Sequence, residues 1–152
     1  MANNVMSISP ALQCQVGESL GTDILHLSLQ RLIMVAGANR DFALSHSDNA
    51  TAQWGNAPAA YADVIFVFTM FERLLMQWAG PSARVRKLGP LKLHDFLVCG
   101  QDVIGSGVVT AAGECTGPDG ATWREITAEI KLAQNDGRVP VSGLATIMVP
   151  LS

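Results

Sequence analysis

The sequence predicts an α+β domain in which a curved antiparallel sheet wraps around one long buried helix. Three features predict it: a strongly apolar segment over residues 59–79, segments of alternating apolar and polar residues after residue 81, and Gly- and Asp-rich turns between them. The apolar surface of the helix and the apolar face of the sheet must both be buried, and packing the helix against that face buries both. The 152 residues allow one core and are too few for two ordinary domains, so we expect a single domain over residues 1–152.

Before the long helix, the sequence predicts a short helix followed by a polar loop. Residues 1–27 mix Ser, Gly, Asn and short apolar patches, and we expect a leader there with a possible first strand over residues 24–27. Ser28 can cap a helix over residues 29–36, where apolar residues recur at helical spacing, and Gly37 is a stop signal. The chain then enters a polar loop over residues 38–56.

The long helix is predicted from length and from the signal that ends it. Apolar residues run almost all the way round over residues 64–71, which is typical of a helix enclosed on most sides. Val, Ile and Phe also favour strands, but the segment continues as Glu72-Arg73-Leu74-Leu75, and its length favours a helix. Gly80-Pro81 ends it, because few helices continue through that pair.

Period-two alternation predicts four long strands after Pro81. We expect them over residues 84–92, 96–111, 122–133 and 138–149, with turns at residues 117–120 and 135–137. In the third strand one face is apolar, formed by Ile126, Ala128, Ile130 and Leu132, and the residues between them are mainly charged. This alternation predicts a sheet with one wet side and one dry side.

The composition and net charge of the chain indicate which kinds of partner it can bind. The chain is 49% hydrophobic and only 15% charged, which predicts that another subunit covers part of its surface. With a net charge of −3 and no long Lys/Arg run, it lacks the basic footprint of a nucleic-acid binder.

The length of the apolar runs argues against a membrane span, and the spacing of the cysteines argues against a metal site. The longest apolar run, residues 64–71, is far below the about 20 residues that cross a bilayer, and we expect a cytoplasmic protein. Cys14, Cys99 and Cys115 are widely spaced, with no CxxC pair and no His at ligand spacing, so we expect free, partly buried thiols and no metal.

The main candidate site is Asp41-Phe42-Ala43-Leu44-Ser45-His46, a carboxylate and an imidazole in the polar loop between two helices. Together an Asp and a His can take a proton from water and deliver one to carbon near neutral pH. The spacing by itself is weak evidence, because a loop Asp that caps a turn beside a solvated His gives the same pattern.

Further motifs carry a family resemblance over residues 27–151. They are Trp78-Ala79-Gly80-Pro81 at the end of the long helix, Gly89-Pro90-Leu91, His94-Asp95-Phe96, and a closing Gly-Leu-Ala-Thr-Ile-Met-Val-Pro at residues 143–150. In this order, with the Asp-x4-His loop, the chain resembles the MaoC-like acyl-CoA hydratases of the hot-dog fold. Residues 40–83 look most like the small catalytic subunit of heteromeric hydratases that act on steroid side-chain enoyl-CoA esters.

The resemblance implies hydration of a trans-2-enoyl-CoA to the 3-hydroxyacyl-CoA, with Asp41 and His46 at the two catalytic positions. His46 would orient and deprotonate the water while Asp41 handles the second proton. The family needs no metal or redox cofactor, since coenzyme A is part of the substrate. It also implies a homodimer, or a heteromer with a related hot-dog subunit, with the acyl-thioester in a tunnel at the subunit boundary.

Two departures from the family pattern concern the site. The usual Asn-Pro of the loop motif is Ala43-Leu44 here, which removes a turn-forming pair but no catalytic group. The usual Ala-His-Gly at the start of the long helix is replaced by Ala62-Asp63-Val64. We therefore assign the thioester oxyanion to the Val64 backbone N–H, with the Asp63 carboxylate beside it unless that side chain turns away.

Other candidates have plain structural explanations beside the functional ones. Trp54 is a candidate lining residue of the acyl tunnel, although large aromatics are more often core. Arg84 and Arg86 could bind coenzyme A phosphates, and a solvated edge strand explains them equally well. We expect His94 to be a turn residue and His26 a structural histidine.

Two rival functions stay open at this stage. A hot-dog thioesterase would direct water at the carbonyl with a carboxylate, and the paired His46 argues against it. A non-catalytic partner subunit of a heteromeric hydratase usually lacks the Asp or the His, and this sequence has both.

Overall fold

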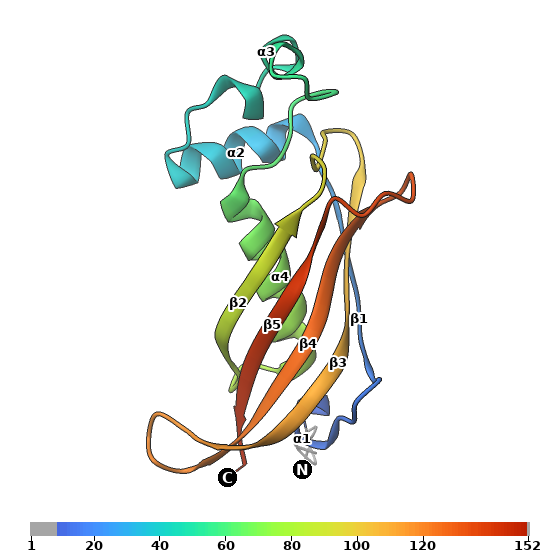
Figure 1. The fold of residues 1–152 in the computed structure, drawn as a ribbon. Helices are drawn as coiled ribbons and strands as arrows, with labels where there is room; N and C mark the ends of the chain where they lie inside the picture. The colour runs from blue at the N-terminus through green and yellow to red at the C-terminus, as the bar shows by residue number, and fades with distance from the viewer. Residues whose placement is uncertain (1–8, 152) are drawn as a thin grey trace, which may run out of the picture.

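A computed structural model describes residues 9–151 as one curved five-stranded antiparallel sheet with a long helix packed against it (Figure 1). In chain order the elements are α1 (Pro10–Gln13), β1 (Ser19–His26), α2 (Leu29–Asn39), the 3-10 helix η1 (Leu44–His46), α3 (Asn49–Trp54), α4 (Val64–Ala79), β2 (Arg84–Leu93), β3 (Asp102–Thr116), β4 (Thr122–Gln134) and β5 (Val141–Pro150). The strand order across the sheet is β1-β3-β4-β5-β2, so β1 and β2 are its two edges.

Helix α4 buries one face in the core, but it is not enclosed on most sides as expected, because Val64, Ile65, Thr69, Glu72 and Gln77 are exposed. Its buried residues are Phe66, Val67, Met70, Phe71, Leu74, Leu75, Trp78 and Ala79. The helix begins at Val64 rather than at residue 59, because residues 60–62 are extended and pair with residues 97–99 through Tyr61 and Val98. It ends where predicted, at Gly80, whose φ of 85° favours glycine.

The sheet has the predicted wet and dry faces. Along β4 the residues Ile126, Ala128, Ile130 and Leu132 are all buried, and they pack in the cluster that also contains the buried side of α4. The turns at residues 117–120 and 135–137 connect β3 to β4 and β4 to β5, as predicted. The sheet therefore supplies one wall of a core whose other wall is α4.

Other element boundaries also differ from the sequence prediction, including the end of β3, which lies at Thr116 rather than at residue 111. Strand β3 begins at Asp102 rather than at residue 96, because residues 94–101 form an irregular segment that packs beside α4's start. Strand β5 begins at Val141 rather than at residue 138. Helix α2 continues through Gly37 to Asn39 and ends at Arg40, whose φ of 57° is left-handed and whose N–H bonds back to Ala36 and Gly37.

Residues 9–27, within the segment expected as a leader, belong to the fold. Strand β1 starts at Ser19, earlier than expected, and pairs with β3, while Ala11 of α1 is fully buried in the core. The first eight residues of the expected leader lie outside the described residues. The buried Asp23 of β1 makes a two-point ion pair with Arg73 of α4, at 2.7 and 2.6 Å, which joins the edge strand to the central helix.

The helices α2 and α3 lie beyond the end of the sheet at which β2 finishes, and α1 and the end of β5 lie at the opposite end (Figure 1). The start of α4 is at the same end as α2. No helix within residues 9–151 has the length and apolar character needed to cross a bilayer. The cysteines in this range, Cys14, Cys99 and Cys115, are free thiols, as expected.

Candidate active site

His46 is held in one orientation by a backbone carbonyl. It ends η1, is only 8% exposed, and its Nδ1 lies 2.8 Å from the carbonyl oxygen of Tyr61. A carbonyl can only accept, so Nδ1 carries the proton and donates it. In the neutral ring Nε2 then has a free lone pair, which is the state that a general base requires.

The Asp41 carboxylate faces that free nitrogen. Asp41 directly follows the left-handed Arg40 at the end of α2, and its backbone N–H bonds to Ala36. Its Oδ1 accepts from the N–H of Ala43 at 3.2 Å, and its Oδ2 lies 3.4 Å from His46 Nε2. A carboxylate and an unprotonated ring nitrogen are both acceptors, so a proton or a water molecule between them satisfies both.

Aromatic rings fix the position of the imidazole from the side. The Tyr61 ring meets His46 edge-on, with 5.0 Å between ring centroids, and Phe96 packs on Tyr61 at 4.6 Å. Tyr61 precedes α4 and Phe96 follows β2, so two segments far apart in the chain hold one catalytic candidate. This packing limits rotation of the ring away from Asp41.

The two side chains open into a cavity of about 530 Å³. Its lining residues are Asp41, His46, Tyr61, Ala62, Asp63, Val64, Ile65, Val67, Leu93, His94, Asp95, Phe96, Leu97 and Val141. The volume lies within the range of ordinary small-molecule sites, and the lining combines apolar side chains with a few converging polar groups. An acid/base pair at an apolar cavity suits proton transfer to and from a carbon substrate.

Asp63 turns into the protein and caps α4. Its Oδ1 accepts from the N–H of Phe66 at 2.6 Å, and its Oδ2 accepts from the Asn39 side chain at 3.2 Å. Asp63 is 5% exposed, and each of its carboxylate oxygens accepts one of these two hydrogen bonds. The N–H groups of Val64 and Ile65, in the first turn, have no acceptor within the helix and both residues line the cavity.

The segment after β2 forms the wall facing Asp41. His94 lines the cavity, and its Nε2 lies 2.9 Å from Ser142 Oγ on β5. Its backbone N–H donates to the carbonyl of Pro140, which holds this segment against the chain just before β5. Asp95 beside it is bound by Arg138 at 2.5 Å, and its pKa lies below the ordinary value, chiefly because the Phe96 N–H donates to it and also because of Arg138.

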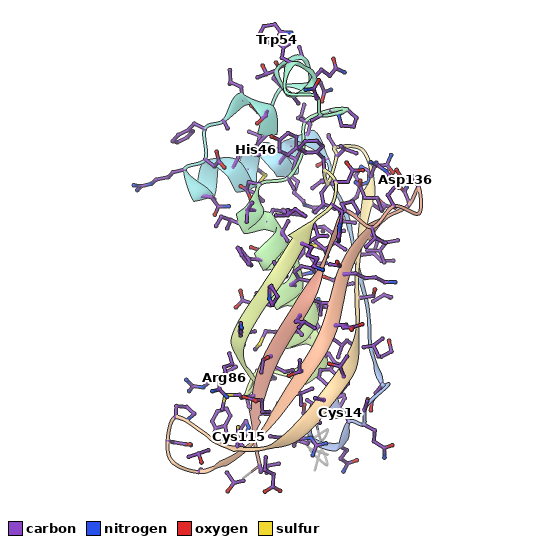
Figure 2. All side chains as sticks on the ribbon, in the orientation of Figure 1. Cys14, His46, Trp54, Arg86, Cys115 and Asp136 are labelled. Carbon is purple, nitrogen blue, oxygen red and sulfur yellow. The ribbon has the colours of Figure 1, made fainter. Side chains whose placement is uncertain are left out.

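Three predicted binding residues do not reach this cavity. Trp54 ends α3 on the surface, 86% exposed and at the far tip of the molecule, so it does not line this cavity (Figure 2). Arg86 lies at the opposite end of the sheet from His46, in an ion pair with Glu125 (Figure 2). Arg84, near it at the start of β2, stacks over Trp123 at 5.7 Å.

Neither the remaining histidine nor a second hollow provides an alternative acid/base site. His26 Nδ1 lies 2.7 Å from Asp102 Oδ1 on the neighbouring strand, which agrees with a structural role. The outer face of the sheet has a hollow of about 700 Å³, whose lining contains Lys92, Glu129 and Lys131 but no histidine. Within residues 9–151, no three His, Cys, Asp or Glu side chains are grouped to bind a metal.

The sequence matches no protein-family model and no curated protein sequence. Solved structures do match. The ChsH1–ChsH2 complex from Mycobacterium tuberculosis has a chain with a TM-score of 0.76 at 23% identity, over 91% of this chain and 99% of that one. The (R)-hydratase from A. caviae, involved in PHA biosynthesis, has a TM-score of 0.76 at 21% identity, over 91% and 98%.

A MaoC-like dehydratase from Rhodospirillum rubrum has a TM-score of 0.73 at 18% identity, over 90% of this chain and 93% of that one. These similarities cover the sheet and α4 together. The chain has the hot-dog fold. At these identities the likeness establishes the hot-dog architecture, while the residues of the site come from this chain's own geometry.

Several cavity residues of the hot-dog domain were not predicted from sequence as site residues. Tyr61 acts through its backbone carbonyl, for which the side-chain pattern gives no signal. Phe96, Asp95 and Leu97 follow β2, and the His94-Asp95-Phe96 motif was the available indication. The sequence prediction did place Asp41, His46, Asp63 and Val64 in one site, and the structure brings these four to one cavity.

Proposed function

We propose that this hot-dog domain is an enoyl-CoA hydratase, which adds water across the 2,3 double bond of a trans-2-enoyl-CoA to give the 3-hydroxyacyl-CoA. The observation that carries the proposal is the approach of Asp41 Oδ2 to His46 Nε2, 3.4 Å apart at the cavity, with Nδ1 fixed on the Tyr61 carbonyl. Such a pair binds one water between two acceptors and aligns it for attack.

In the proposed reaction His46 Nε2 takes a proton from the water molecule while the water oxygen bonds to C3 of the acyl chain. The electron pair of the double bond moves toward C2 and the thioester oxygen, and the Asp41–His46 pair returns a proton to C2. The charge that develops on the thioester oxygen is met by the free N–H groups of Val64 and Ile65 at the start of α4. Because Asp63 is turned onto Phe66, its carboxylate does not face that oxygen.

The substrate is an acyl-thioester of coenzyme A, and the proposed chemistry needs no metal or redox cofactor. The sequence resemblance adds steroid side-chain thioesters to linear ones as candidate acyl groups. One side of the cavity is bordered by exposed apolar side chains, Val64, Ile65 and Leu93. We propose that a second hot-dog subunit covers them and completes the tunnel; among the similar structures are complexes named ChsH1–ChsH2 and HadBC.

The test is an assay of the hydration of enoyl-CoA esters, from crotonyl-CoA to steroid side-chain esters. Hydration is monitored as the loss of the absorbance of the conjugated thioester. The wild type and His46→Ala are compared, alone and with co-expressed hot-dog subunits, after circular dichroism has shown that the variant is folded. We expect a loss of about 10²- to 10⁴-fold in rate for His46→Ala.

Other outcomes of this assay favour the rival functions. Release of free thiol from a saturated acyl-CoA, without hydration, would assign the site to a thioesterase. Hydration by an assembly in which His46→Ala has no effect would make this chain the non-catalytic partner of an active subunit.

A further inference from the structure

The two members of the acid/base pair are tied to the same short segment of backbone. The Tyr61 carbonyl accepts from Nδ1 of His46 at 2.8 Å. Two positions later, the Asp63 carboxylate accepts from the side-chain amide of Asn39 at 3.2 Å. Asn39 is the last residue of α2 and stands two positions before Asp41, so this second bond holds the chain from which Asp41 projects.

Backbone hydrogen bonds fix the segment that carries both attachment points. The N–H of Ala62 donates to the Leu97 carbonyl at 2.9 Å. The Ala60 carbonyl accepts from the N–H of Cys99 at 2.7 Å. A catalytic pair must be held to within about 0.5 Å of its working geometry, and a segment bonded in this way is a suitable fixed reference for both residues.

The bonds that Asp41 makes itself are local. Its N–H donates to the Ala36 carbonyl at 2.9 Å, and its Oδ1 accepts from the N–H of Ala43 at 3.2 Å. Both partners lie within five positions of Asp41 in the chain, so these bonds move with the end of α2. The distance from Asp41 to His46 therefore depends on what holds the end of that helix.

The end of α2 is held by Asn39. Within residues 9–151, the bond from Asn39 to Asp63 is the one side-chain hydrogen bond between α2 and α4. The buried residues of α2 are Leu32 and Ala36, whereas residues 37–39 are exposed. Packing against the core therefore stops before the last three residues of the helix, and the Asn39 amide is what ties them to α4.

The chemistry of this bond suits a fixed attachment. Asp63 is 5% exposed, and its other oxygen accepts from the N–H of Phe66 at 2.6 Å. Loss of the Asn39 amide would leave a buried carboxylate oxygen without its donor, which is costlier than loss of a bond between neutral groups. The amide also supplies the donor without placing a second charge beside Asp41.

We infer that Asn39 is a positioning residue for the hydration: through Asp63 it fixes the end of α2 and so keeps Asp41 at the distance from His46 that a shared water molecule requires. This rests on the proposed function. Asn39 does not line the cavity, so it acts through Asp41 and contacts no substrate. Its loss should therefore lower kcat and leave KM nearly unchanged.

Three variants test the bond by removing, opposing and exchanging its partners. Asn39→Ala removes the donor and should lower kcat about 10- to 10²-fold, with KM within about twofold of the wild type. Asn39→Asp sets a second carboxylate against Asp63, and its loss should be at least as large. The exchanged variant Asn39→Asp/Asp63→Asn again has one amide and one carboxylate, and it keeps an oxygen for the N–H of Phe66. Its kcat should return to within about threefold of the wild type.

A readout without substrate accompanies the rates. Hydrogen exchange measured by mass spectrometry should show faster deuterium uptake over residues 37–43 in Asn39→Ala and Asn39→Asp. The exchanged variant should return to the wild-type rate, and β4 should be unaffected in all three. Gln53→Ala is the matched control, because it removes a side-chain amide that also donates at 3.2 Å, to the Pro58 carbonyl at the end of α3. It should change neither kcat nor the exchange over residues 37–43.

The outcomes separate this inference from the proposed function. If the wild type hydrates an enoyl-CoA and Asn39→Ala is equally fast, or exchanges no faster over residues 37–43, the inference is overturned and the proposed function stands. An exchanged variant as slow as Asn39→Asp would also overturn it, because restoring the bond would then have restored nothing. A wild type that hydrates no ester in any assembly would overturn the proposed function, and the inference with it.

Discussion

The Nδ1 of His46 is bound to the carbonyl oxygen of Tyr61 at 2.8 Å, which leaves Nε2 as the nitrogen that faces Asp41. A side-chain acceptor at that position could itself change protonation, whereas a backbone carbonyl cannot. The carbonyl is fixed in turn by the extended segment before α4, where the neighbours of Tyr61 bond to residues 97 and 99. The tautomer of the base therefore depends on backbone structure.

Asp63→Ala should destabilise the domain by about 1–2 kcal/mol, because the N–H of Phe66 loses its acceptor at the start of α4. Asp63→Ser keeps a capping oxygen and should recover most of the loss. Urea unfolding followed by circular dichroism measures both. If Asp63 acted on the substrate instead, Asp63→Asn would abolish hydration while the stability stayed near that of the wild type.

Arg73→Met should cost about 2 kcal/mol of unfolding free energy, since it leaves the buried Asp23 without its partner. We expect a value below the usual range of about 3–5 kcal/mol for a buried pair because the Arg73 side chain is itself 37% exposed. The double variant Asp23→Leu/Arg73→Met should be more stable than Arg73→Met alone, since no unpaired charge remains. A double variant that is less stable than Arg73→Met would show that the ion pair is not the source of the loss.

Asp95→Asn should lower the melting temperature slightly at neutral pH and have less effect in acid. The folded pKa of Asp95 is below its ordinary value, chiefly through the Phe96 N–H and also through Arg138. A lowered folded pKa gives stability that is present above the unfolded pKa, about 3.9, and is lost as the pH falls through the folded pKa. Melting curves from pH 7 to pH 3 check this, and a difference that grows in acid would be of the wrong sign.

The general architecture could be predicted because its signals are local in the sequence. The apolar run that becomes α4 and the alternation of Ile126, Ala128, Ile130 and Leu132 both act within one element. The start of α4 was misplaced because residues 60–62 are held extended by residues 97–99, about 35 positions further along the chain. Helix propensity contains no information about that pairing.

The candidate pair could be predicted for the same reason, since Asp41 and His46 lie in one short loop. Trp54 and Arg86 could not be placed correctly, because which end of an element meets the cavity depends on how the helices stack over the sheet (Figure 2). The contributions of Tyr61 and Phe96 depend on a carbonyl and on a ring contact between distant segments. Contacts between segments that lie far apart in the chain cannot be recognised from the spacing of residues in a single sequence.

A double-mutant cycle on hydration by Asp41→Asn, His46→Gln and the combined variant tests the central claim most directly, namely that the two side chains act on one water molecule. Rates are measured under single-turnover conditions in whichever assembly is active. Each single variant should lose about 10²- to 10⁴-fold, and the double variant should be about as slow as the slower single one, because the two residues act as a unit. Losses that multiply in the double variant would contradict the account, since they would show that Asp41 and His46 act independently.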